Sequence, residues 1–174
     1  MGEAKRRKTT GTDEGADEEA LVIERVARRL HRAFTVEGAC YRTTLFLRYH
    51  LAHAHAHGIR GEAVIGYVND GTDDLYSSHA WFEHRGLVTD VALCRPLEPR
   101  LQKRGAVLVQ GKEVVPGWAY TYHRERPADA FAVAAYDKLH AAMTRIAHDE
   151  DEIRAYLDGA PDGIGYARMA ALAR

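Results

Sequence analysis

Cysteine is scarce in this chain, which has only Cys40 and Cys94 among its 174 residues. Two thiols are too few for the disulfide framework of a small secreted domain, and a lone pair of thiols suits a reducing compartment. The chain also lacks any apolar run of about 18 residues, the length that a membrane-spanning helix needs. No apolar segment follows the basic residues near the N-terminus, so no secretory signal is present. These absences predict a soluble cytoplasmic protein whose cysteines act separately.

Charge of one sign is not in excess either. The chain has 24 basic and 25 acidic residues, which gives a formal net charge of -1. Such a balance provides no general attraction to nucleic acid or to an anionic membrane, and we predict neither as a partner. A hydrophobic content of 46% over this length is enough for one domain with its own core.

The first 16 residues are charged and nearly free of large apolar side chains, and we expect a disordered tail there. A single domain is predicted over residues 17–174. Apolar residues recur at steps of three and four from Asp17 to near Thr35, which indicates an amphipathic helix. A second helix is expected from Cys40 to His57, because Gly58 provides a C-terminal stop.

The middle of the chain follows a period of two, which is typical of strands. Strands are predicted at residues 62–68, 76–84 and 87–93, and weaker patterns indicate two more at 106–109 and 118–123. Arg85 and Gly86 form a two-residue hairpin connection between the second and third strands. Helices are then predicted at residues 128–157 and 166–172. The order of elements along the chain is helices, then antiparallel strands, then helices. This order indicates an α+β fold without a parallel βαβ sheet.

Cys40 is a candidate nucleophile because it lies in the first turn of a predicted helix. Unpaired backbone N–H groups and the helix dipole favour a thiolate there, and the same N–H groups can donate to an oxyanion. Such a thiol needs a histidine base that a third group holds in one tautomer. The hairpin offers His79 and Asp90. With Arg85 and Gly86 in the turn, Asp90 lies on the face of His79 and diagonal to it, within side-chain reach.

The ordered residues resemble the core of transglutaminase-like, papain-like cysteine enzymes. The resemblance covers residues 36 to 95 and consists of Gly-Ala-Cys-Tyr-Arg opening a helix, a strand of the form Gly-Ile…Gly-Tyr, then His-Ala-Trp-Phe-Glu and Gly-Leu-Val-Thr-Asp. It implies a papain-like fold and a triad of Cys40, His79 and Asp90. The proportions are similar to those of the small leader peptidases of lasso-peptide maturation.

The resemblance implies acyl transfer through a thioester on an amide of a peptide or protein substrate, without a cofactor. Water as acceptor gives a peptidase or amidase, and an amine gives a transamidase; the triad does not choose between them. Trp81 alternates onto the face of His79 and Tyr41 follows Cys40, so both are candidates for substrate binding, although a tryptophan in the core is an equal alternative. A non-catalytic protein-binding module with the same fold is the alternative function.

A metal site is the weaker alternative for a group of histidines before Gly58. His50, His53 and His57 share one helix face at steps of three and four, a workable spacing for imidazole ligands. No nearby cysteine or carboxylate completes the set, and a polar face at a helix C-terminus explains the pattern equally well. We therefore predict no resident metal.

Overall fold

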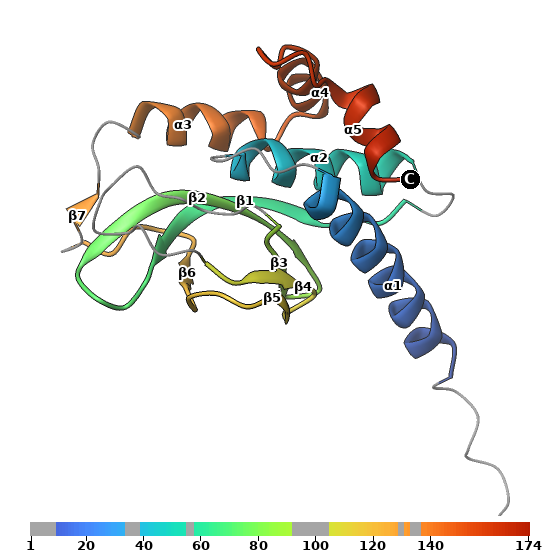
Figure 1. The fold of residues 1–174 in the computed structure, drawn as a ribbon, viewed down its shortest axis with the longest axis horizontal. Coiled ribbons are helices and arrows are strands. Elements are labelled where there is room, and N and C mark those ends of the chain that lie inside the picture. The colour runs from blue at the N-terminus through green and yellow to red at the C-terminus, as the bar shows by residue number, and fades with distance from the viewer. Residues whose placement is uncertain (1–9, 34–38, 55–57, 92–104, 129–130, 133–136) are drawn as a thin grey trace, which may run out of the picture.

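The computed structural model describes residues 10–33, 39–54, 58–91, 105–128, 131–132 and 137–174. These residues form an α+β fold in which helices cover one side of a curled sheet (Figure 1). The helices are α1 (Thr10–Ala33), α2 (Cys40–His53), α3 (Asp137–Ile146), α4 (Glu150–Asp158) and α5 (Tyr166–Leu172). The strands are β1 (Glu62–Asn69), β2 (Leu75–His84), β3 (Leu87–Thr89), β4 (Val107–Val109), β5 (Lys112–Val115), β6 (Thr121–His123) and β7 (Phe131–Ala132).

The main sheet has the strand order β3-β2-β1-β6, and its neighbouring strands are antiparallel. The predicted antiparallel sheet is confirmed for these strands, and the short strand β7 adds one parallel pairing at the beginning of β2. Strands β4 and β5 form a separate hairpin. In Figure 1 this hairpin and β6 lie beneath β1 and β2, on the side away from the helices. The chain therefore places helices on one face of the sheet and further strands below the other.

The hairpin between β2 and β3 has the predicted turn and register. Arg85 and Gly86 both have positive φ, at 52° and 75°, as a two-residue hairpin turn of the primed type requires. His84 pairs with Leu87, and the register continues to Phe82 opposite Thr89. The predicted position of Asp90 relative to His79 depends on this pairing of β2 with β3.

Strand β3 is shorter than predicted, because it ends at Thr89 and not at residue 93. The backbone of Asp90 turns to the β4 hairpin instead: its N–H donates to the carbonyl of Leu108 at 2.8 Å, and the N–H of Leu108 donates back at 3.0 Å. Asp90 therefore pairs with Leu108, which is distant in the sequence, and β3 does not continue along β2. Residues 92–104, which include Cys94, lie outside the described residues.

The core lies between α2 and the helix-facing side of β1 and β2. Alternate strand residues, such as Ile65, Ala80 and Phe82, pack against fully buried side chains of α2 such as Leu45 and Phe46. Phe82 also contacts Gly61 so closely that a Cβ there would overlap its ring. Hydrophobic burial on this face holds α2 against β2 and so fixes where Cys40 lies.

Three helix boundaries differ from the prediction. Helix α1 begins at Thr10, so the boundary placed at residue 16 falls inside it, although only Glu14 and Ala16 before Asp17 are good helix formers. Helix α2 ends at His53, and residues 55–57 are not described. The single helix predicted over 128–157 is wrong: it contains β7, α3 and α4. Asp149 separates the last two helices by accepting hydrogen bonds from the N–H groups of Asp151 and Glu152.

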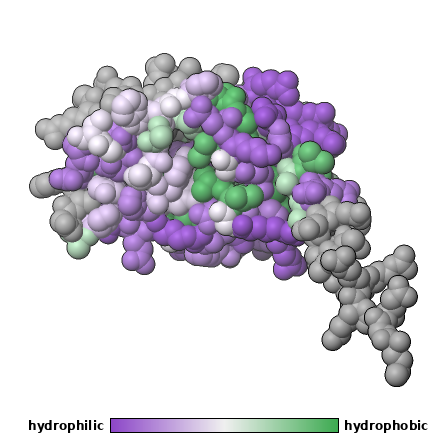
Figure 2. Space-filling view, turned by 90° about the horizontal axis from the view of Figure 1, so that it is seen from below, coloured by the Kyte–Doolittle hydropathy of each residue, from purple (hydrophilic) through white to green (hydrophobic). Residues whose placement is uncertain are grey.

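Within the described residues, no helix is both long and apolar enough to cross a membrane. Figure 2 views the molecule from below, where hydrophobic residues form a strip across the centre and hydrophilic residues surround it. Most of the large apolar side chains are buried, and the described exceptions are Leu21, Leu87, Trp118 and Leu139.

Candidate functional site

His79 and Asp90 form a buried pair on neighbouring segments of the hairpin. Nε2 of His79 lies 2.6 Å from Oδ2 of Asp90, and the two side chains are 0% and 3% exposed. A carboxylate oxygen only accepts, so the hydrogen of this bond is on Nε2 of the imidazole. In the neutral ring the acceptor nitrogen is then Nδ1. The pair therefore has the tautomer and support that a general base needs.

Aromatic side chains enclose this pair. The hydroxyl of Tyr122 on β6 donates to the same Oδ2 of Asp90 at 3.0 Å, and its ring centroid lies 6.4 Å from that of His79. Trp81, two residues along β2, is 1% exposed and makes an edge contact with Tyr122 at 5.1 Å. Gly66 pairs with His79 across the ladder and leaves space that the Trp81 ring occupies. Trp81 lies on the face of His79, as predicted, and packs as a core residue.

Cys40 is the first residue of α2, as predicted, and is 7% exposed. The preceding Ala39 makes no side-chain cap, and the first helical hydrogen bond runs from the N–H of Thr43 to the Ala39 carbonyl at 2.9 Å. The N–H groups of the first turn before Thr43 therefore have no partner within the helix. These N–H groups and the helix dipole favour a negative charge near the start of α2.

Tyr41 links the neighbourhood of Cys40 to that of His79. Its hydroxyl lies 2.6 Å from Oγ of Ser78, the residue before His79. Burial raises the pKa of Tyr41 to about 12, the Ser78 hydrogen bond opposes that rise, and the charges of Cys40 and His79 act on it in opposite directions. Both candidate residues thus lie within electrostatic range of one phenol. Since Tyr41 is 7% exposed and bonded internally, it supports the site rather than offering an open surface.

The hydrogen bonds of the described residues do not join Cys40 to His79. Neighbouring strand residues alternate between faces, so Ser78, which contacts α2, and His79 point to opposite sides of β2. One edge of β2 pairs with β1 from Ser77 to Glu83, whereas β3 covers the other edge only from Phe82 to His84. None of the described strands pairs with this second edge beside His79.

Comparison with protein-family models, curated proteins and solved structures gives no match to this chain. The transglutaminase-like resemblance therefore continues to rest on its motifs. The structure itself shows an α+β architecture, a helix that begins at Cys40 and a contact between His79 and Asp90, and it identifies no family.

A second histidine near the site was not predicted. Nδ1 of His140 on α3 lies 2.7 Å from Oγ of Ser78, which extends the Tyr41 contact to a row of three polar groups. The Tyr67 ring stacks on His140 at 4.5 Å, and burial lowers the pKa of this histidine. No sequence signal identifies this contact, because Ser78 and His140 are 62 residues apart and belong to different elements.

The histidines considered as metal ligands have other contacts. Nδ1 of His50 lies 3.2 Å from the hydroxyl of Tyr166, and Nε2 of His53 lies 3.0 Å from Oε2 of Glu150. His57 lies outside the described residues. Among the described residues, no three His, Cys, Asp or Glu side chains are grouped as metal ligands would be.

Proposed function

We propose that this chain is a cysteine hydrolase or acyltransferase of the transglutaminase-like, papain-like kind, acting on an amide bond of a peptide or protein. The contact between His79 and Asp90 carries the proposal, because a fully buried imidazole bound to a carboxylate at 2.6 Å is the base and orienter that a nucleophilic thiol requires. The start of α2 at Cys40 supports the role of nucleophile for this thiol, because backbone N–H groups at a helix start favour a negative charge.

In this proposal Cys40 is the nucleophile. His79 accepts the thiol proton at Nδ1 while Nε2–H remains bonded to Asp90, whose negative charge stabilises the imidazolium that forms. Sγ then bonds to the amide carbon, and the C–N bond breaks as His79 returns the proton to the leaving nitrogen. The product is a thioester on Cys40.

The first turn of α2 has a second role in the same step. When Sγ attacks, the carbonyl oxygen becomes an oxyanion beside the backbone N–H groups that precede Thr43. Such preorganised donors stabilise the tetrahedral intermediate, and losing one donor typically costs about 10²–10³ in kcat. One helix end therefore serves both the nucleophile and the transition state.

Hydrolysis is the favoured fate of the thioester. Water can attack it after His79 removes a proton, which releases the acid and regenerates the thiol. An amine acceptor instead gives a new amide, and this reaction needs a second binding site for the amine. We therefore place peptidase or amidase activity ahead of transamidation.

The test is the rate of alkylation of Cys40 by iodoacetamide over a range of pH, read by mass spectrometry so that Cys94 in the same chain is a reference. An ordinary thiol becomes reactive near its usual pKa of about 8.5. We expect Cys40 to react fast near neutral pH in the wild type and to lose this reactivity in His79→Ala. His53→Ala is the matched control, because it removes an imidazole that is exposed and bonded to Glu150.

Slow reaction at Cys40, equal to that at Cys94 and unchanged in His79→Ala, would favour the alternative of a non-catalytic binding module. Fast reaction that depends on His79 justifies a screen of peptides and amides. In that screen, hydroxylamine or an added amine should capture the acyl group if the thioester forms, and Cys40→Ser should abolish capture.

A further inference from the structure

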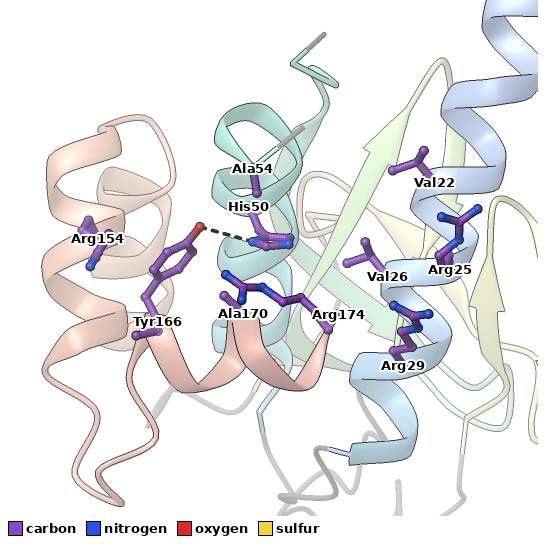
Figure 3. Close-up of a pocket in the computed structure, with 12 residues that line it drawn as sticks. Val22, Arg25, Val26, Arg29, His50, Ala54, Arg154, Tyr166, Ala170 and Arg174 are labelled. Atoms are coloured by element: carbon purple, nitrogen blue, oxygen red, sulfur yellow. Dashed lines mark hydrogen bonds between the residues drawn. The ribbon is translucent and has the colours of Figure 1, made fainter. Parts of the chain in front are cut away.

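A cavity of about 520 Å³ lies between the helices, away from His79 and Asp90. Helix α1 forms one wall, α2 forms the floor, and α4 and α5 form the other wall (Figure 3). Its volume is within the usual range of sites for small organic molecules, about 300–1,000 Å³. The site discussed above does not use this cavity.

Arginines surround the cavity. Arg25 and Arg29 come from α1, Arg154 from α4, and Arg174 follows α5, while none of the described residues lining the cavity is acidic. Arg154 bonds to Asp158 at 2.6 Å and lies over the ring of Tyr166. In the part of the chain that the structure describes, the other three guanidinium groups make no ion pair.

The positive charges that line this cavity repel one another. Arg25 and Arg29 are one helical turn apart on the same face of α1, and a pair of like charges at this spacing destabilises a helix by a few tenths of a kcal/mol. On the neighbouring face, by contrast, Arg28 is paired with Glu24 at 2.8 Å. An anion in the cavity would relieve the repulsion, since the planar guanidinium fork matches carboxylate and phosphate oxygens.

The rest of the lining is apolar or aromatic. Val22 and Val26 point into the space from α1, and Ala170 faces it from α5 (Figure 3). His50 on the floor is 6% exposed and contacts the hydroxyl of Tyr166 at 3.2 Å. A ligand of this cavity therefore needs an apolar body as well as a negative head.

We propose that the cavity binds a small organic anion that carries a phosphate or carboxylate group on an apolar body. Arg25 and Arg29 on one wall and Arg174 on the other contact the anionic oxygens. The apolar body lies against Val22, Val26 and the small residues of α5. The site is separate from the proposed acyl-transfer chemistry and does not depend on it.

Isothermal titration of the full chain tests this inference with phenyl phosphate, benzoate, inorganic phosphate and benzyl alcohol at one low ionic strength. We expect phenyl phosphate or benzoate to bind, and the stronger of the two identifies the anionic group. Inorganic phosphate, which has no apolar body, and benzyl alcohol, which has no charge, should each bind at least about tenfold more weakly.

The decisive variant combines Arg25→Gln with Arg29→Gln, and it should weaken binding of the preferred anion by at least about tenfold. Its matched control combines Arg28→Gln with Arg32→Gln. These two arginines have the same spacing on the same helix, and replacing them removes the same charge, but neither of them lines the cavity. The control should change affinity by less than about twofold.

Several results would overturn the inference. One is the absence of binding by both aromatic anions. Equal loss of affinity in the two double variants would mean that general surface charge attracts the anion. Equal affinity for inorganic phosphate and phenyl phosphate would remove the role of the apolar lining. Because all four arginines on α1 are at least partly exposed, the variants should fold, and circular dichroism confirms this.

Discussion

Tyr122 donates its hydroxyl hydrogen to the same oxygen of Asp90 that His79 contacts, at 3.0 Å and 2.6 Å respectively. Two donors from different strands thus converge on Oδ2 of one buried carboxylate. Hydrogen bonds to a charged group are stronger than those between neutral groups. The position of the His79 ring is therefore fixed by a carboxylate that is itself fixed by β6.

Removing that hydroxyl should cost stability. We expect Tyr122→Phe to lower the free energy of unfolding by about 1.5–3 kcal/mol, the usual range for a hydrogen bond to a charged partner. Urea denaturation measures this loss. Tyr76→Phe is the control, because its half-buried hydroxyl makes no hydrogen bond with a described residue. Equal losses in both variants would show that the Tyr122 contact contributes nothing specific.

Changing Asp90 should separate its effect on the base from its effect on folding. In Asp90→Asn the side chain keeps its shape but can no longer stabilise an imidazolium, and its amide allows the wrong tautomer of His79. We expect alkylation of Cys40 near neutral pH to fall by at least about tenfold. Circular dichroism at the same pH establishes that the variant is folded. Unchanged alkylation in a folded variant would remove Asp90 from the proposed mechanism.

Glycine at position 66 is required by close packing. A Cβ there would overlap the Trp81 ring and the backbone carbonyl oxygen of His123, and the carbonyl cannot move without breaking the sheet. Gly66→Ala should therefore destabilise the fold by about 1–3 kcal/mol, as overpacking in a core does. Gly15→Ala is the opposite case: it lies in α1 with open space around it, and we expect a gain of about 0.5–1 kcal/mol. Thermal unfolding of both variants checks the contrast.

Asp149 should contribute more to the stability of the fold than an ordinary surface aspartate does. Its carboxylate accepts from the N–H groups of Asp151 and Glu152 at 2.9 and 3.1 Å, which begins α4. Asp149→Ala should cost about 0.5–2 kcal/mol of stability. Asp74→Ala, in the exposed turn after β1, should change stability by less than about 0.5 kcal/mol. The urea denaturation midpoints of the two variants show whether Asp149 acts as a helix cap or as an ordinary polar residue.

The raised pKa of Tyr41 gives a pH dependence at the alkaline end. Burial favours the neutral phenol and raises its pKa from 10.0 to about 12 in the folded chain. Between these two values the unfolded chain loses the proton while the folded chain keeps it, so stability falls as pH rises through this interval. The slope of unfolding free energy against pH should be smaller in Tyr41→Phe.

Local features of the sequence determined the parts of the fold that depend on local contacts. Arg85 and Gly86 form the turn, and period-two alternation sets the register of β2 and β3 as far as Thr89, the residue before Asp90. The start of α2 at Cys40 also follows from local signals. The break between α3 and α4 was missed, although Asp149 has the residue type of a helix cap, because apolar periodicity continues across it.

Tertiary structure alone decided the contacts between elements that are distant in the chain. The bond from Tyr122 to Asp90 spans 32 residues, that between Ser78 and His140 spans 62, and the arginine cavity joins α1 to α4 and α5. Sequence patterns show which face of a helix or strand is apolar, but not which other face it meets. That choice is made when all buried surfaces are packed together. It placed the Tyr122 hydroxyl against Asp90 and four arginines around one cavity.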